Sequence, residues 1–230
     1  MNIQQPLLKA KFVGRPNRFV ATARLNGKTE EAHVANSGRL MELLMPENQV
    51  YLYRAERNGR RTHFDLSLVK VGPTLVSINS MLPSALFHEA FLKGKLTPFR
   101  EYNIARREVT FGESRLDLLL TNAHDTCYIE TKCSTLVVNG AAMFPDAPTT
   151  RGVKHLGALT HAVKAGNRAA VVFIIQRNDA TSFIPNWRGD PDFCKTLVSS
   201  VKQGVEVYAY ACKVTTKRIT IEREVEVKLQ

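Results

Sequence analysis

The stretch Leu116-Asp117-Leu118-Leu119-Leu120 and the later stretch Ile129-Glu130-Thr131-Lys132 decide the fold of this chain. Both segments have the apolar character of buried strands, yet together they contain two acids and a lysine. A carboxylate among leucines is costly to remove from water unless a positive group meets it. Because side chains alternate along a strand, Glu130 and Lys132 are expected on one face.

Pairing of segments 114–121 and 126–134 as neighbouring strands would bring Asp117, Glu130 and Lys132 to one point. Two carboxylates can hold a divalent cation there and the lysine can position a water, which are the parts that phosphodiester cleavage needs. Hard oxygen ligands favour Mg²⁺ or Mn²⁺ over zinc. The alternative is a buried ion pair in which Lys132 neutralises one acid. Such a pair leaves the second acid uncompensated, whereas a metal ion satisfies both.

The composition is that of a folded, basic protein. The chain has 230 residues, 44% of them hydrophobic, which is enough for one large domain or for a small domain and a medium one. Its net charge is +11. Residues 1–79 hold 12 Lys and Arg against 6 Asp and Glu, and residues 80–230 hold 20 against 15. The excess of positive charge per residue is larger in residues 1–79. This charge balance fits a polyanionic partner, most simply nucleic acid.

Nothing in the sequence indicates a membrane or an oxidising compartment. The longest apolar run, Ala169–Ile175, has seven residues, whereas a membrane helix needs about 20. The first residues, Met1–Pro6, carry no secretory signal. We therefore expect a cytoplasmic protein. Its four cysteines lack the Cys-x-x-Cys spacing of a zinc site and are interpreted as reduced core thiols: Cys127, Cys133, Cys194 and Cys212.

The first 79 residues have the rhythm of a small β-barrel. Short strand-like segments alternate with turn residues, and Asn26-Gly27 and Asn58-Gly59 are hairpin signals. The predicted strands are Leu7–Val13, Arg18–Leu25, Lys28–Ala35, Val50–Glu56, Arg61–Val71 and Thr74–Ile78, with a short helical turn at Arg39–Leu44. Five or six short strands and a basic surplus indicate an OB-like barrel that binds nucleic acid, with a small sandwich as the alternative.

Residues 80–230 change to a mixed α/β pattern. The predicted helices are Pro83–Lys93, Thr149–Ala165 and Asp192–Gln203. The predicted strands are Arg107–Gly112, Ser114–Thr121, Thr126–Ser134, Arg168–Gln176, Val205–Val214 and Arg218–Val227. This order indicates a central mixed sheet with at least one parallel crossover. The boundary near residue 80 carries no flexible linker.

Further acids and bases accompany the central trio. Upstream of the trio, Glu89 on the first helix and Glu108 on the strand Arg107–Gly112 each offer a third carboxylate, and ordinary solvent exposure is the alternative for Glu89. Thr149 or Thr150 can cap the long helix. Three polar residues beside its apolar stripe could meet phosphate near the helix N-terminus, although a solvated helix face is the simpler explanation: Arg151, Lys154 and His155.

The barrel segment offers phosphate contacts of its own. The turn Asn36-Ser37-Gly38-Arg39 could grip a phosphate, with glycine allowing close approach, or it is an ordinary turn. Arg15 and Arg18 lie among aromatic residues that could stack on single-stranded bases. Most of those aromatics are expected in the core: Phe12, Phe19, Tyr51, Tyr53 and Phe64.

Four segments make the whole chain recognisable: Arg115-Leu116-Asp117, Cys127-Tyr128-Ile129-Glu130-Thr131-Lys132, Phe144-Pro145-Asp146-Ala147 and Arg151-Gly152-Val153-Lys154-His155-Leu156. They resemble the sugar fermentation stimulation protein A family. The resemblance runs essentially end to end and includes Asn36-Ser37-Gly38 and Asn79. The third and fourth segments are specific to that family, whereas the Asp…Glu-x-Lys core is shared with PD-(D/E)XK nucleases.

The resemblance implies an N-terminal OB-fold joined to a PD-(D/E)XK nuclease-like domain, and sequence-nonspecific DNA binding. It assigns Asp117 and Glu130 as metal ligands, Lys132 as the catalytic lysine and Glu89 as the helix acid, a place that Glu108 could take instead. The long helix has Arg, Lys and His where many such nucleases have glutamine, which leaves the substrate contacts open.

The expected function is a Mg²⁺- or Mn²⁺-dependent nuclease acting on DNA, or on RNA or a hybrid, as a monomer or an oligomer. The alternative is a non-catalytic DNA-binding regulatory factor of sugar (maltose) metabolism that keeps the nuclease scaffold.

Overall fold

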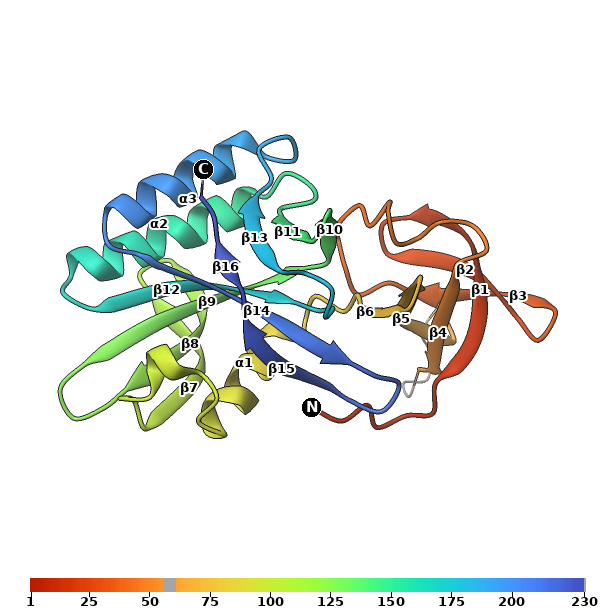
Figure 1. Cartoon of the computed structure of the whole chain (residues 1–230), viewed down its shortest axis with the longest axis horizontal. Coiled ribbons are helices and arrows are strands. Elements are labelled where there is room, and N and C mark those ends of the chain that lie inside the picture. Colours follow the sequence, from red (N-terminus) through yellow and green to blue (C-terminus); the bar gives the residue numbers. More distant parts are fainter. Residues whose placement is uncertain (56–60, 230) are drawn as a thin grey trace.

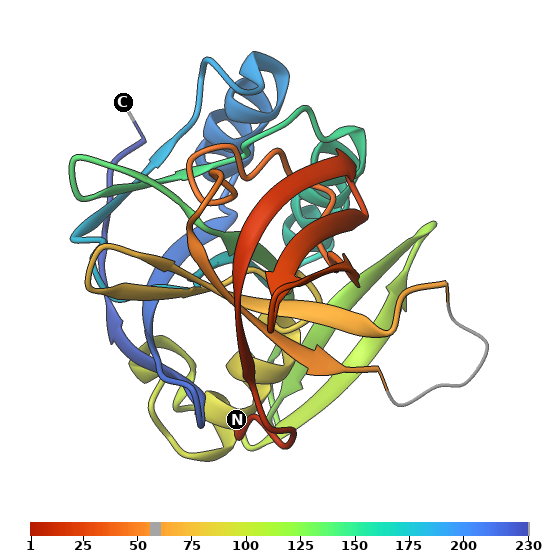
Figure 2. The same cartoon turned by 90° about the vertical axis from the view of Figure 1, so that its right-hand side faces the viewer.

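A computed structural model describes residues 1–55 and 61–229 and shows two β-rich parts side by side (Figure 1). The first part consists of β1 (Leu8–Asn17), β2 (Val20–Leu25), β3 (Lys28–His33), β4 (Gln49–Arg54), β5 (Phe64–Val71) and β6 (Thr74–Ser77). Their order is β3-β2-β1-β4-β5-β6, and a parallel pairing of β3 with β5 closes the sheet into a barrel. Figure 2 views this barrel with β1 curving across the front. The predicted OB-like barrel is confirmed, and the sandwich alternative is not.

The second part is built on a six-stranded mixed sheet in the order β15-β14-β12-β9-β8-β7. Its strands are β7 (Ile104–Phe111), β8 (Ser114–Thr121), β9 (Thr126–Ser134), β12 (Arg168–Ile175), β14 (Glu206–Val214) and β15 (Ile219–Glu224). The central strands β9, β12 and β14 run parallel, and the outer strands join antiparallel. The mixed sheet with a parallel crossover is therefore confirmed.

Helices cover both faces of this sheet (Figure 1). On one face α1 (Pro83–Leu92) and the 3-10 turn η1 (Thr97–Phe99) pack through Phe87 and Phe99 on Ile129 and its neighbours. On the other face α2 (Thr150–Lys164) and α3 (Pro191–Lys202) bury Leu159 and Phe193 against Phe173. The apolar stripes of the helices thus sandwich the strands that carry the acids.

Side-chain and main-chain hydrogen bonds join the two parts directly. Gln176, which follows β12 and is fully buried, donates its amide to the carbonyls of Ser77 (3.0 Å) and Asn79 (2.9 Å). The main-chain carbonyl of Gln176 accepts the Ser77 N–H at 3.0 Å. The parts therefore meet at a bonded seam.

Several elements differ from the sequence-based predictions. Residues 39–44 form turns and no helix, and a small sheet of β10 (Leu136–Val138), β11 (Ala141–Phe144), β13 (Ser182–Pro185) and β16 (Glu226–Val227) was not predicted. Such short strands carry too little alternation to be seen in a sequence. The Asn58-Gly59 hairpin signal lies outside the described residues. No helix in the described part of the chain is long and apolar enough to cross a membrane.

Candidate active site in the cleft between the two parts

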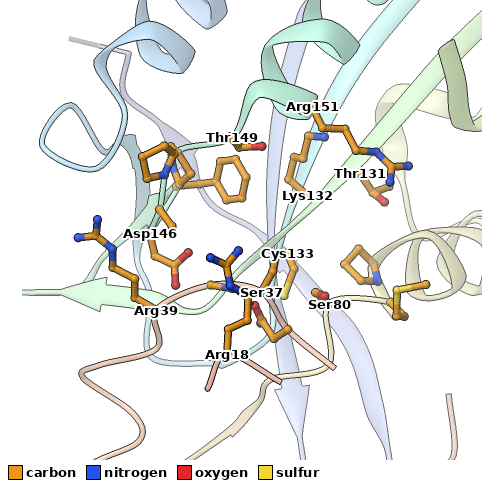
Figure 3. A pocket seen from close by; sticks show the side chains of 18 of the residues that line it. Arg18, Ser37, Arg39, Ser80, Thr131, Lys132, Cys133, Asp146, Thr149 and Arg151 are labelled. Carbon is orange, nitrogen blue, oxygen red and sulfur yellow. Dashed lines mark hydrogen bonds between the residues drawn. The ribbon is translucent and has the colours of Figure 1, made fainter. Parts of the chain in front are cut away.

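A cleft of about 960 Å³ runs along the seam, with the barrel forming one wall and the mixed-sheet domain forming the other wall and the floor. Figure 3 shows side chains of both walls, Arg18, Ser37 and Arg39 from the barrel and Thr149 and Arg151 from the start of α2. The floor residues come from neighbouring strands: Asp117, Glu130, Thr131, Lys132 and Cys133. The cleft therefore gathers sequence motifs that are far apart along the chain.

The strand register brings the predicted trio together. Leu118 pairs with Ile129, so Asp117 and Glu130 take the next opposed positions on β8 and β9. The backbone pairing of β8 with β9 ends at Leu118 and Ile129. Beyond it, the Asp117 carboxylate accepts the Thr131 N–H at 2.8 Å. Lys132 Nζ lies 2.6 Å from Glu130 Oε1, as expected for two residues on one face of a strand. The three side chains line one cleft floor.

A buried histidine stands behind Glu130. His155 of α2 is 6% exposed, and its Nδ1 contacts the same Glu130 oxygen that Lys132 contacts. Arg151, one turn earlier, donates Nε–H to His155 Nε2 at 3.3 Å. Because Nε2 accepts that bond, the hydrogen of a neutral ring lies on Nδ1, where it donates to Glu130. Arg151 and His155 thus fix the orientation of the carboxylate.

The two carboxyls have pKa shifts of opposite sign. Burial raises the pKa of Asp117, and the nearby charge of Glu130 raises it further, against the hydrogen bonds from Thr131. Burial also acts to raise the pKa of Glu130, but Lys132 and His155 outweigh it, and the pKa lies below its usual value. Asp117, whose charged form is disfavoured by burial and by Glu130, is therefore the carboxyl that gains most from an added cation.

The structure separates the two candidates for a third acid. Glu89 does not line the cleft, because it lies on another side of α1, where its carboxylate contacts Lys93 and the N-terminal nitrogen of Met1. Glu108 does line the cleft. Pairing of Arg107 with Leu118 and of Val109 with Leu116 places Glu108 opposite Asp117 on β7. Its backbone is left-handed (φ 58°), and its carboxylate lies 3.3 Å from Arg115.

The predicted basic residues divide in a similar way. Arg15, Arg18, Arg39 and Arg151 line the cleft. Lys154 does not, and its amine lies 3.8 Å from Glu113. The Arg15 guanidinium donates to four backbone carbonyls of the adjoining turns, so it mainly shapes the cleft wall: Arg18 (2.6 Å), Asn36 (3.0 Å), Gly38 (2.8 Å) and Arg39 (2.6 Å).

A divalent cation fits the donor set of the floor. No three His, Cys, Asp or Glu side chains among residues 1–55 and 61–229 form a group that could hold a metal. Mg²⁺ does not need such a cage, since it often keeps several waters and takes one or two carboxylates plus substrate phosphate. Glu130 Oε2 is buried and has no hydrogen-bond partner in the described structure. An unmet buried carboxylate oxygen beside a second, desolvated carboxyl is the environment that a cation would stabilise.

Comparison with known proteins supports the resemblance. Residues 13–78 match the family described as "SfsA N-terminal OB domain", and residues 81–218 match "Sugar fermentation stimulation protein RE domain". The chain belongs to the sugar fermentation stimulation protein family. Proteins named "Sugar fermentation stimulation protein homolog" are 44% identical over 229 residues in Caldanaerobacter subterraneus subsp. tengcongensis, covering 100% of both chains, and 46% identical over 225 residues in Moorella thermoacetica, covering 97% of each.

A solved structure has the same fold. It is titled "The structure of Pyrococcus Furiosus SfsA in complex with Ca2+" and superposes with a TM-score of 0.89 at 30% identity, covering 99% of this chain and 98% of that one. Likeness over nearly the whole of both chains means that barrel and mixed-sheet domain occur together in the sugar fermentation stimulation fold.

Two motifs of the sugar fermentation stimulation family meet across the cleft. Asp146, in the Phe144-Pro145-Asp146-Ala147 segment, accepts the Leu40 N–H at 3.2 Å. A Cβ at Gly38 would lie 2.4 and 2.6 Å from the Asp146 carboxylate oxygens. Glycine therefore does permit a close approach at this turn, and the group that approaches is a carboxylate of the other domain.

Sequence reasoning overlooked three residues of the cleft walls. Arg107 of β7 donates to Ser84 at 3.4 Å, and Met41 and Met81 stand exposed on opposite walls. Strand alternation would put Arg107 and its neighbour Glu108 on opposite faces, so the sequence did not indicate that both line the cleft. The methionines gave no signal, because a single methionine in an irregular segment is compatible with core and surface alike.

Proposed function

We propose that this protein is a Mg²⁺- or Mn²⁺-dependent phosphodiesterase that cuts DNA or a related polynucleotide in the cleft between its two domains. One observation carries the proposal: Asp117, Glu130 and Lys132 line the floor of a single cleft whose walls are rich in arginine. Two carboxylates and a lysine are the side chains that metal-assisted phosphodiester hydrolysis requires. The Ca²⁺ complex of the Pyrococcus furiosus relative adds support for a divalent cation in this fold.

Each residue of the floor has a distinct role in this proposal. Asp117 and Glu130 would hold the cation, with the Thr131 carbonyl as a further oxygen donor and Glu108 as the third acid. When bound, the cation supplies Lewis-acid polarisation of the scissile phosphate. Lys132, held against Glu130 at 2.6 Å, would orient the attacking water and offset charge that develops on the phosphate. Arg18, Arg39 and Arg151 would bind flanking phosphates.

The competing function is polynucleotide binding without cleavage, in a regulatory role. The free-energy cost of desolvating two carboxyls argues against this alternative, because a site that binds no cation would leave that cost uncompensated.

A cleavage assay tests the proposal. Linear, supercoiled and single-stranded DNA are incubated with the protein in Mg²⁺, Mn²⁺ or chelator, beside Asp117→Asn and Lys132→Ala. We expect metal-dependent cutting that both substitutions reduce by at least about 100-fold. Equal cutting by wild type and variants would reveal a contaminating nuclease. Binding without any cutting would leave only the regulatory function.

A second pair of variants assigns the third acid. Glu108→Gln should raise the Mn²⁺ concentration that cutting requires, because Glu108 lies opposite Asp117 in the cleft. Glu89→Gln should leave cutting unchanged, because Glu89 lies outside the cleft beside Lys93. The reverse result would return the role to the helix acid.

A further inference from the structure

The two walls of the cleft each carry an exposed methionine. Met41 of the barrel is 74% exposed and Met81, just before α1, is 76% exposed. These are the two most exposed of the large hydrophobic side chains in the described chain, and both line the cleft. Large apolar side chains exposed in the lining of a polar cleft indicate that the occupant has apolar surface of its own.

The aromatic residues that could have served as stacking platforms are mostly unavailable. Phe12, Tyr51 and Phe64 are between 2% and 7% exposed and belong to the core. Phe19 alone among the five is exposed, at 49%, next to the cleft residue Arg18. Phe144, Pro83, Pro145 and Pro148 also line the cleft, but among the described lining residues Met41 and Met81 are the exposed large hydrophobic side chains. The methionine thioether is flexible and polarizable, and it makes favourable contacts with aromatic rings of varied shape.

The charge around the methionines fits a polyanion. Six basic residues line the cleft against four acids: Arg15, Arg18, Arg39, Arg107, Lys132 and Arg151 against Glu108, Asp117, Glu130 and Asp146. A cation held by the floor acids would leave the basic charge in large excess. The cleft thus offers phosphate contacts and apolar contacts within one volume, which is the combination found in grooves for single-stranded nucleic acid.

The depth of the floor favours one strand over two. Glu130 is 3% exposed, and the Lys132 side chain is 12% exposed, so the reacting phosphate has to enter between the walls. A duplex presents sugars and phosphates on its outside and keeps the faces of its bases stacked within. An unpaired strand exposes those faces, and it can place them against Met41 and Met81 while its phosphates reach the floor.

We propose that the cleft binds a single-stranded segment of polynucleotide, with unpaired bases against Met41 and Met81. The inference rests on the proposed function, since it specifies the form of polynucleotide that the same cleft takes. The two methionines act on base faces regardless of sequence, whereas the arginines act on phosphates. Contacts of these two kinds have different experimental signatures.

Binding in chelator tests the inference without any cutting. Fluorescence anisotropy compares a 20-nucleotide single strand of mixed sequence with the duplex of that sequence, over a series of salt concentrations. We expect wild type to bind the single strand at least about tenfold more tightly. The double variant Met41→Ala/Met81→Ala should lose about tenfold or more of the single-strand affinity, with an unchanged slope of log K against log salt.

Matched controls separate apolar from ionic contact. Met45→Ala removes a methionine from the same irregular segment as Met41, 54% exposed but outside the cleft, and should change nothing. Arg39→Ala should reduce the salt slope by about 1. Thermal melting of each variant verifies that it is folded.

Three outcomes would overturn the inference: equal affinity of wild type for single strand and duplex, an unchanged affinity of the double methionine variant, or an equal loss on both ligands. The cleavage assay keeps these outcomes apart from failure of the proposed function. Metal-dependent cutting of a duplex that binds as tightly as the single strand would refute the inference and leave the phosphodiesterase in place.

Discussion

At the scale of single residues, Glu130 is held by contacts on two sides. Lys132 reaches it from the same strand, and His155 reaches it from α2. Both contacts fall on Oε1, and Oε2 is left without a hydrogen-bond partner in the described structure. A carboxylate that is held through Oε1 and has no hydrogen-bond partner at Oε2 is already oriented to bind a ligand through Oε2.

Replacement of Asp117 by asparagine should have opposite effects on the metal-free and the metal-bound protein. The raised pKa of Asp117 means that its charged form is disfavoured in the folded state. Stability of the metal-free protein should therefore fall as pH rises through that raised pKa, and Asp117→Asn should remove the fall. At pH 7 we expect a gain of about 1 kcal/mol, or roughly 2–4 °C in Tm.

We expect Mn²⁺ to raise the Tm of wild type by binding at the proposed site, and the same variant should lose this rise. Differential scanning fluorimetry with chelator and with Mn²⁺ measures both effects. Asp125→Asn, at an exposed position after β8, is the matched control and should change neither. A lower metal-free Tm for Asp117→Asn would contradict the assignment of Asp117 as a destabilised carboxyl.

His155 should act as a positioning residue for the proposed metal site. Loss of a group that orients a ligand typically costs 10–100-fold in metal affinity, and we expect that loss for His155→Ala. His155→Asn places an amide N–H near the position of Nδ1 and should restore part of it. Calorimetric titration with Mn²⁺ measures the affinities. The control is Lys154→Ala, the exposed neighbour on α2. Equal affinities for the alanine and asparagine variants would mean that His155 serves only packing.

At the scale of elements, the turn between β3 and β4 sets one wall of the cleft through Gly38. A methyl group there would overlap the Asp146 carboxylate, so Gly38→Ala should destabilise the protein by about 1–3 kcal/mol. Gly157→Ala on α2 is the control, because no atom lies within 4 Å of its added Cβ. That change should stabilise the helix by about 0.5–1 kcal/mol.

Urea denaturation measures both glycine variants. A further Asp146→Ala change in the Gly38→Ala background should recover part of the loss if the clash is its cause. Full additivity of the two substitutions would show that the turn and the carboxylate act independently.

The elements could be predicted from the sequence where the signal is local. Strand alternation around Asp117 and Glu130 and capping of the long helix by Thr149 or Thr150 depend on neighbouring residues, and both were predicted. The structure has Thr149 as the cap, whose side chain accepts the Gly152 N–H at 3.0 Å. The contact of His155 with Glu130 joins residues 25 positions apart, and no local pattern contains it. The position of Glu89 outside the cleft was not foreseen for a similar reason, since packing between α1 and its neighbours decides which side of the helix meets the cleft.

At the scale of the whole molecule, the seam at Gln176 couples the barrel to the mixed-sheet domain. Gln176→Ala would leave the Ser77 and Asn79 carbonyls without their amide donor. We expect a loss of about 1–3 kcal/mol, because buried acceptors without a partner keep their full desolvation cost. Gln203→Ala, at the exposed end of α3, is the matched control and should lower Tm far less.

Calorimetry tests this coupling. Wild type should unfold in a single transition. Identical transitions for the two glutamine variants would contradict a stabilising seam. Two separate transitions in wild type would show that the barrel and the mixed-sheet domain unfold independently.

The seam also limits how the halves of such proteins can be recombined. The Gln176 amide and the Asp146 carboxylate each find their partner in the opposite half. A chimera that takes its barrel from one parent and its mixed sheet from another inherits only one side of every such bond. We expect such hybrids to be active only when the bonded residues on both sides of the junction are taken from the same parent.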